Sequence, residues 1–292
     1  MSTERRQAGI LQVQNLCKVF GRGGSLLKKE ERFAAVDDVS FELVPGEMLG
    51  LLGESGCGKT TLARMLMHLI RPTSGSIILN GEEVQDLPER EFRKRRKTIQ
   101  MVYQNPFDCL DPSRKILSQL EEPMRLWHPQ MDTAARRGAI LEMLTECGLP
   151  GESLKKLPRE FSGGQLQRIS IARALLARPQ VLIADEIISA LDVPIQNQIL
   201  QLLFKMKEEY RLSILFITHD LSVARKMSDR VMVMREGRLR GIGAPEEVFR
   251  NQEEPYIKAL GEAVFTFRTF ASTVHSFCAG PGPDAAQNLP PE

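Results

Sequence analysis

Cysteine is scarce in this chain of 292 residues, and no two cysteines lie close together. They stand at Cys17, Cys57, Cys109, Cys147 and Cys278. This spacing contains neither a zinc-ligand pattern nor a disulfide framework, which is the usage expected in a reducing cytosol. We therefore expect no structural zinc ion and no disulfide bond.

The chain also lacks a strong net charge and a long apolar run. With 39 basic and 37 acidic residues the net charge is +2, so charge gives no reason to expect nucleic acid as a partner. A basic cluster at residues 90–97 could contact anionic lipid or RNA, but the solvated face of a short helix is the better interpretation. No stretch approaches the roughly 20 apolar residues of a membrane-spanning helix, and the first residues lack the apolar segment of a secretory signal. If the protein acts at a membrane, we expect another chain to provide the spans.

Strand and helix patterns alternate along the chain, without an internal duplication. Short β-type runs lie at 10–16, 36–44, 48–52, 75–81, 97–102, 181–184, 213–217 and 230–234. Helical periodicity covers 134–147, 165–176, 195–210 and 221–227, and Pro123, Pro129, Pro150 and Pro158 are interpreted as marking loops. The alternation predicts a single α/β unit with a mostly parallel sheet covered on both faces.

The helical middle is interpreted as an insertion into that core. We predict an α/β core in residues 1–104 and 179–250, a helical subdomain in 105–178, and a C-terminal extension in 251–292. Short helices are expected at 244–250 and 255–263. After about residue 270 the composition becomes rich in proline, glycine and alanine, so we expect disorder there.

Residues 53–60 read GESGCGKT, the GxxxxGK[ST] pattern of a phosphate-binding loop. An apolar strand precedes the loop and a run of helix formers follows it, which is the context the motif requires. The candidate nucleotide-binding residues are Gly53, Glu54, Ser55, Gly56, Cys57, Gly58, Lys59, Thr60 and Thr61. Glycines let backbone N–H groups turn inward, and the helix start adds partial positive charge. Lys59 is expected to reach the β- and γ-phosphates of a nucleotide, and the Thr60 hydroxyl to ligate Mg²⁺.

The second chemical motif follows the apolar run 181–184. Asp185 comes at the carboxyl end of this predicted strand, the edge where ligands bind in open α/β sheets. We expect Asp185 to hold Mg²⁺, and Glu186 to polarise the attacking water or to accept its proton. Alone this pattern is weak, because apolar strands often end in polar turns, but beside the glycine loop it is strong.

Ser162, Gly163, Gly164 and Gln165 predict a second helix start with exposed backbone amides. An ordinary capped helix is the plainer interpretation. Since one site rarely needs two such loops, we infer that this one serves a neighbouring subunit.

Together with residues 161–168, FSGGQLQR, these motifs resemble an ATP-binding cassette (ABC) ATPase, and the resemblance covers roughly residues 11–263. It implies a P-loop NTPase fold with a mixed β core and the inserted helical subdomain. It also implies that Gln104 contacts Mg²⁺ and relays to a membrane subunit, that Asp192 belongs to the D-loop, and that His219 contacts the γ-phosphate. Phe20 is a candidate for stacking on adenine, with core packing nearly as good an interpretation. Ile187 and Ile188 depart from the family's usual Pro-Thr, and Phe161 replaces its usual Leu, without removing a catalytic group.

The sequences at residues 104–112 and 255–260 are similar to those of the ATPases of dipeptide, oligopeptide and nickel importers. In that group two different ATPases usually form a pair, and this chain is more similar to the second of them. The resemblance implies ATP and Mg²⁺ as cofactors. Its implied partners are a second, different ATPase, two membrane permeases and, indirectly, a solute-binding protein, with no nucleic acid. The implied location is the cytoplasmic face of the inner membrane. Relatives often carry a cysteine cluster near the C-terminus, but only Cys278 lies there, so we expect no iron–sulfur centre.

Three functions compete at this stage. A peptide importer ATPase is favoured, with a nickel or metal-chelate importer as the alternative cargo. A soluble ABC ATPase without a transport role would usually show two cassettes or a long coiled coil, and neither is visible. A non-catalytic cassette is disfavoured because Lys59, Asp185, Glu186 and His219 are all present.

Overall fold

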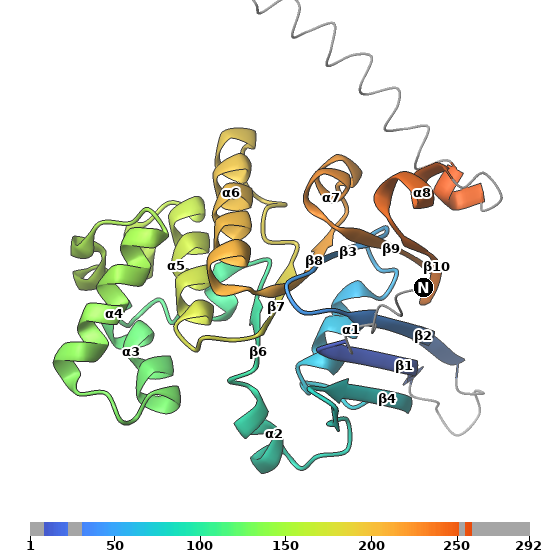
Figure 1. Cartoon of the computed structure of the whole chain (residues 1–292), viewed down its shortest axis with the longest axis horizontal. Coiled ribbons are helices and arrows are strands. Elements are labelled where there is room, and N and C mark those ends of the chain that lie inside the picture. Colours follow the sequence, from blue (N-terminus) through green and yellow to red (C-terminus); the bar gives the residue numbers. More distant parts are fainter. Residues whose placement is uncertain (1–8, 23–30, 251–254, 259–292) are drawn as a thin grey trace, which may run out of the picture.

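The computed structural model describes residues 9–22, 31–250 and 255–258, which form two β-sheets with helices packed around them (Figure 1). Most of the predicted C-terminal extension lies outside the described residues, as do Cys278 and the segment after residue 270. Of that extension, residues 255–258 are described and are helical.

The larger sheet of the described residues has the strand order β10-β9-β3-β8-β7-β6. Its strands are β3 (Met48–Leu52), β6 (Ile99–Val102), β7 (Val181–Asp185), β8 (Ser213–Thr218), β9 (Arg230–Arg235) and β10 (Arg238–Gly243). All run parallel except β10, which pairs antiparallel with β9. Alternate residues of β7 enter opposite cores, Val181 and Ile183 on one side and Leu182 and Ala184 on the other. Burial on both faces explains why these strands read as continuous apolar runs.

The β-type runs at 10–16, 36–44 and 75–81 belong to a separate antiparallel sheet, which the sequence patterns did not predict. Its order is β2-β1-β4-β5, with β1 (Leu11–Arg22), β2 (Glu31–Leu43), β4 (Ser74–Leu79) and β5 (Glu82–Glu83). Helix α1 (Lys59–Leu66) lies between the two sheets (Figure 1) and buries Leu62 and Leu66 in the core they share. One face of the parallel sheet is therefore covered by α1 and this second sheet.

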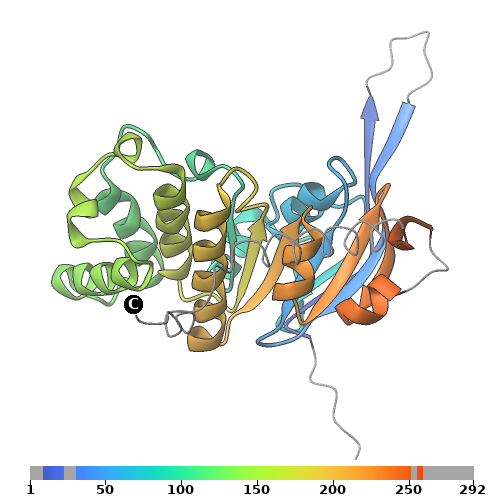
Figure 2. The ribbon, with the colours of Figure 1, turned by 90° about the horizontal axis from the view of Figure 1, so that it is seen from above.

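The other face of the parallel sheet packs against helices. Between β6 and β7 come η1 (Pro106–Asp108), α3 (Ile116–Trp127), α4 (Thr133–Glu146), η2 (Gly151–Lys155), η3 (Pro158–Glu160) and α5 (Gly163–Leu175). These helices gather at one end of the molecule (Figure 2), inside the segment 105–178. The remaining helices are α2 (Glu89–Arg95), α6 (Val193–Tyr210), α7 (Leu221–Met227) and α8 (Pro245–Arg250). The domain boundaries themselves stay a prediction.

Helix α3 corrects the interpretation of Pro123 as a loop marker, because Pro123 lies inside the helix. Proline lacks the N–H that would bond the carbonyl one turn earlier, at Gln119. That carbonyl instead accepts a hydrogen bond from Nε of Arg173 on α5, at 3.4 Å. The neighbouring helix thus satisfies the group that proline leaves free.

Three of the six basic residues in the cluster at 90–97 pair with neighbouring glutamates. Arg95 donates to both carboxylate oxygens of Glu82, Lys94 pairs with Glu91 at 2.8 Å, and Arg96 pairs with Glu89 at 2.7 Å. These contacts favour the solvated helix face over an anion-binding surface.

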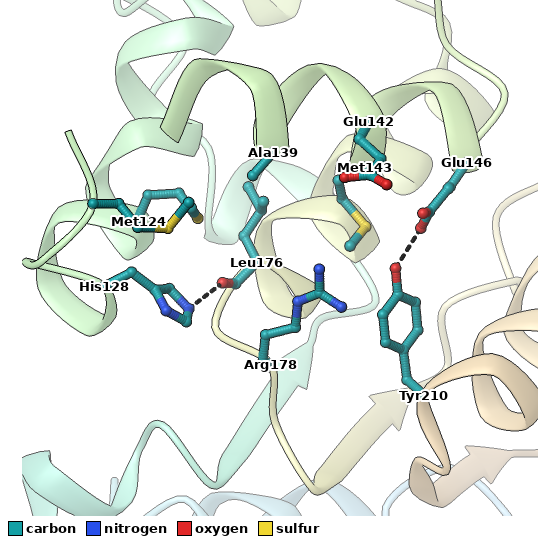
Figure 3. Close-up of a pocket in the computed structure, with 10 residues that line it drawn as sticks. Met124, His128, Ala139, Glu142, Met143, Glu146, Leu176, Arg178 and Tyr210 are labelled. Carbon is teal, nitrogen blue, oxygen red and sulfur yellow. Dashed lines mark hydrogen bonds between the residues drawn. The ribbon is translucent and has the colours of Figure 1, made fainter. Parts of the chain in front are cut away.

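A cavity of about 180 Å³ lies where the inserted helices meet the core (Figure 3). One hydrogen bond crosses this joint, and a second lies within the inserted segment beside the cavity. The Tyr210 hydroxyl at the end of α6 donates to Glu146 of α4 at 2.6 Å, and His128 Nε2 lies 3.1 Å from the Leu176 carbonyl oxygen. Burial and the bond to Glu146 raise the pKa of Tyr210, so the hydroxyl remains a donor at neutral pH.

Tyr210→Phe should therefore lower the free energy of unfolding by about 1–2 kcal/mol, the range for a hydrogen bond to a charged group that is partly solvated. Chemical denaturation monitored by circular dichroism measures the loss. Glu142→Gln alters a charge lining the same cavity without touching the hydroxyl, and should be neutral. Equal stability of Tyr210→Phe and the unmodified chain would contradict a role for the bond.

Candidate active site

Four strands of the large sheet deliver the predicted functional residues to one edge. The glycine loop follows β3, Asp185 ends β7, and His219 follows β8. Gln104 comes just after β6. Because these strands are parallel, their carboxyl ends share an edge, which is where α/β sheets bind ligands.

The glycine loop has a backbone that only glycine fits. Gly56 and Gly58 have φ angles of 83° and 114°, in the left-handed region. A Cβ atom on Gly58 would lie 2.1 Å from the Ala35 carbonyl oxygen of β2. The loop therefore packs directly on the second sheet, and α1 begins at Lys59 with no side-chain cap on its first amides.

Lys59 is buried beneath this loop. Its Nζ donates to the carbonyl oxygens of Gly53 and Glu54 at 2.7 and 2.9 Å, and lies 3.6 Å from Oε1 of Glu186. The ammonium group is thus held between the phosphate-binding loop and the carboxylate that follows β7. Cys57, in the same loop, is also buried, and burial raises the pKa of its thiol, so it is protonated at neutral pH.

Asp185 is a buried carboxylate whose Oδ1 has no hydrogen-bond partner. Burial, and then the charge of Glu186, raise the pKa of Asp185, while the Thr60 hydroxyl and the Lys59 ammonium lower it. An unpaired buried carboxylate oxygen beside a hydroxyl is the donor set that Mg²⁺ prefers. The residues therefore fit the predicted metal.

Glu186 is the centre of a cluster drawn from four segments. Its backbone is left-handed, with φ of 48°, and its amide donates to the Ile217 carbonyl oxygen of β8 at 3.0 Å. Its Oε2 lies 3.4 Å from His219 Nδ1 and accepts from Gln104 Nε2 at 3.4 Å. With Lys59 on Oε1, the carboxylate is oriented from three sides while remaining partly accessible.

The cavity beside these residues has a volume of about 390 Å³. It is lined by Phe20, Phe33, Ala35, Ser55, Gly56, Gly58, Lys59, Thr60, Thr61, Gln104 and Glu186. Phe20 is 44% exposed, so it does not pack in a core. The polar residues form one end of the cavity and the two phenylalanines supply an apolar part, as a ligand with phosphates and an aromatic base requires.

Phe33 and Ala35 are the residues that sequence reasoning missed. Phe33 is 62% exposed and directly opposite Phe20 in the antiparallel β1–β2 pair. Its role depends on the register of that pair, which includes several irregular shifts. Phe33 lies just before the predicted strand 36–44, and nothing in the sequence placed it beside Phe20.

Phe33→Ala should weaken ATP binding about 5- to 150-fold, since removing an aromatic that stacks on a base costs about 1–3 kcal/mol. Titration of the variant with a fluorescent ATP analogue measures the affinity. Phe204→Ala, which truncates an exposed phenylalanine on α6, is the matched control and should bind as before. Unchanged affinity in Phe33→Ala would exclude contact with the base.

The loop at Ser162–Gln165 does not line this cavity. Ser162 caps α5 in a capping box with Gln165, whose amide donates to the Ser162 hydroxyl at 3.4 Å. Gly164 lies so close to α6 that an added Cβ would stand 2.4 Å from a methyl of Ile195. The start of α5 therefore packs beside the start of α6, which follows Asp192, and Ser162, Gly163, Gln165 and Asp192 are exposed there.

Comparisons with known proteins agree with this arrangement. Residues 36–189 match the ABC transporter family. The chain is 43% identical over 264 residues to the oligopeptide transport ATP-binding protein AppF of Bacillus subtilis, covering 90% of this chain and 80% of that protein. It is 41% identical over 251 residues to the di/tripeptide transport ATP-binding protein DppF of Pseudomonas aeruginosa, covering 86% and 77%.

Among solved structures, a dimeric ATP-binding cassette in a post-hydrolysis state, bound to ADP and Pi, superimposes with a TM-score of 0.72 at 30% identity. The match covers 80% of this chain and 98% of that one. The predicted fold class is confirmed. The chain belongs to the ABC transporter family, as one of its ATP-binding ATPases.

Proposed function

We propose that this chain is the ATP-hydrolysing subunit of an importer that carries dipeptides or oligopeptides across the cytoplasmic membrane. The observation that carries the proposal is the convergence of Lys59, Asp185 and Glu186 at one sheet edge, with Gln104 and His219 on Glu186. Relatives named for peptide transport, similar over most of the chain, support the cargo class.

Lys59 and His219 bind the phosphates in this proposal. Lys59 would exchange the Gly53 and Glu54 carbonyls for β- and γ-phosphate oxygens, which are stronger acceptors for an ammonium group. The His219 side chain is about half exposed, and it would contact the γ-phosphate from the solvent side of the site.

Glu186 acts on the attacking water, either by polarising it or by accepting its proton. Its carboxylate is held by Gln104, His219 and Lys59, so it needs little rearrangement before the reaction. Gln104 also donates to the Ser189 hydroxyl at 3.1 Å, which fixes the amide that orients Glu186.

Thr60, Asp185 and Gln104 are the proposed holders of Mg²⁺. The unpaired Oδ1 of Asp185 supports this assignment. When bound, the ion would neutralise charge on the β- and γ-phosphates.

The position of Ser162–Gln165 supports a site shared between two subunits. Within its own chain this helix start does not line the cavity beside the glycine loop, and we propose that it binds a nucleotide held by a partner ATPase, which is a different chain. The dimeric assembly of the similar cassette supports such a pairing.

We place the permease contact at a groove of about 660 Å³ between the core and the inserted helices. Arg90 and Arg93 of α2 line one side, and Leu126 of α3 is an exposed apolar residue on the other. Tyr103, which precedes Gln104, also lines it. A permease segment bound in this groove would contact both the α/β core and the inserted helices, which flank Gln104.

Among the described residues, no helix combines the length and the apolar character that crossing a bilayer requires. We propose that the chain is a peripheral protein on the cytoplasmic face of the inner membrane, carried there by two permeases and supplied by a solute-binding protein.

Reconstitution of the complete complex in nanodiscs tests the proposal. Peptide-loaded binding protein should stimulate ATP hydrolysis, and Lys59→Ala should abolish the stimulated rate. Stimulation by nickel or a metal chelate instead of peptide would support the alternative cargo. Failure of the chain to associate with any permease would favour the soluble, non-transport class.

A further inference from the structure

Helix α5 contacts both ends of residues 103–109, the Gln104 loop. The Gln167 amide, 2% exposed, donates from Nε2 to the Tyr103 carbonyl oxygen at 3.2 Å. One turn later, the Ser170 hydroxyl lies 3.4 Å from Sγ of Cys109. Residues spaced by three lie on the same helix face, so both contacts belong to one side of α5.

Breaking the hydrogen bond between Gln167 and Tyr103 would destabilise the protein. A buried amide without a partner is destabilising, because it has lost its hydrogen bonds to water and gained none in the protein. The bond to Tyr103 is also a bond to the main chain, so a displacement of α5 moves the backbone of the Gln104 loop rather than a side chain alone.

The next residue along the loop reaches the catalytic carboxylate. Gln104 Nε2 contacts Oε2 of Glu186 at 3.4 Å and Oγ of Ser189 at 3.1 Å. At the other end, α5 begins with the capping box of Ser162 and Gln165. A single rigid helix therefore joins the loop proposed to touch the partner's nucleotide to the residue that orients Glu186.

We propose that Gln167 is a positioning residue that links the two ATP sites of the assembled pair. Engagement of Ser162–Gln165 by the nucleotide on the partner subunit is transmitted through α5 and Gln167 to Gln104, and so to Glu186 of the same chain. Hydrolysis at one site then depends on occupancy of the other. This inference rests on the proposed function, because it requires the shared site.

The test measures ATP hydrolysis by the assembled complex against ATP concentration. The unmodified complex should show a Hill coefficient approaching about two, the limit for two sites. Gln167→Met removes the donor while retaining side-chain length, and Gln167→Asn retains the amide but is too short to reach Tyr103. Both should bring the Hill coefficient close to one, while ATP affinity of the isolated chain stays unchanged.

Gln119→Met is the matched control. Gln119 is equally buried at 2% and bonds to Asp111 and Arg114 within the inserted helices, without contact to the Gln104 loop. It should lower thermal stability yet retain cooperativity. If the Gln167 variants fail to assemble, Ser170→Ala weakens the contact at the other end of the loop and should give an intermediate coefficient.

A Hill coefficient in the Gln167 variants equal to that of the unmodified complex would overturn the inference, as would a coefficient of one in the unmodified complex. Neither result touches the proposed function, which fails separately if peptide-loaded binding protein does not stimulate hydrolysis.

Discussion

Glu186→Gln is expected to slow ATP hydrolysis by about 10²- to 10⁴-fold, the contribution of a positioned acid–base group, while leaving ATP binding intact. Glutamine keeps the size of the side chain, so the contacts to Gln104 and the left-handed backbone can persist. It loses the charge that draws a proton from water and that faces Lys59. Since each nucleotide is proposed to bridge the two ATPases, unhydrolysed ATP should hold the variant as a closed, ATP-bound pair.

Stopped-flow phosphate release and size-exclusion chromatography with ATP measure the two effects in the assembled complex. Glu236→Gln is a suitable control, because Glu236 shares the left-handed conformation, with φ of 51°, but is largely exposed. Undiminished hydrolysis in Glu186→Gln would refute the assigned role, and a variant that no longer binds ATP would show that the carboxylate is structural.

Asp185→Asn is expected to abolish Mg²⁺-dependent hydrolysis and, at neutral pH without Mg²⁺, to raise the melting temperature. The pKa of Asp185 is raised, first by burial and then by the charge of Glu186. A raised carboxyl pKa favours the folded state below the ordinary pKa of about 4, and this contribution is lost as pH rises through the folded-state pKa. At pH 7 the ionised group therefore opposes folding, and the neutral asparagine removes that cost.

Differential scanning fluorimetry across pH, with and without Mg²⁺, measures the effect. Each kcal/mol gained corresponds to about 2–4 °C for domains of 150–250 residues, and the advantage of the variant should shrink toward pH 3. Mg²⁺ should stabilise the unmodified chain but not the variant. Asp132→Asn, at the exposed start of α4, is a control for the same substitution and should leave stability nearly unchanged, because the asparagine Oδ1 can still accept from the Ala135 amide. A variant at Asp185 that melts lower than the unmodified chain would contradict the predicted cost of burial.

Local patterns were sufficient to predict the parts of the site that lie within one strand–loop–helix unit. The spacing of Gly53, Gly58 and Lys59 predicted the glycine loop, and the apolar run before Asp185 predicted a strand ending at the ligand-binding edge. In both cases a few neighbouring residues determine the backbone, through glycine's access to positive φ and burial of a strand on both faces.

Prediction from the sequence was wrong or incomplete where a residue's structural role depends on a neighbour far along the chain. Pro123 was interpreted as a loop marker because Arg173, which bonds the Gln119 carbonyl that the proline leaves free, lies far along the chain. The second sheet was missed because alternation of strands and helices does not show which strands pair.

The sequence by itself determined the fold class, through motifs that a few neighbouring residues define. It also predicted a phosphate-binding loop, a carboxylate for Mg²⁺ with its neighbouring glutamate, and a second helix start that serves a neighbouring subunit. Only the tertiary structure decided how these groups meet. It placed Phe33 against Phe20, brought Gln104 and His219 onto Glu186, and tied α5 to the Gln104 loop through Gln167. The physical reason is that strand register and helix packing are set by the whole core, in which each contact joins segments that no local pattern connects.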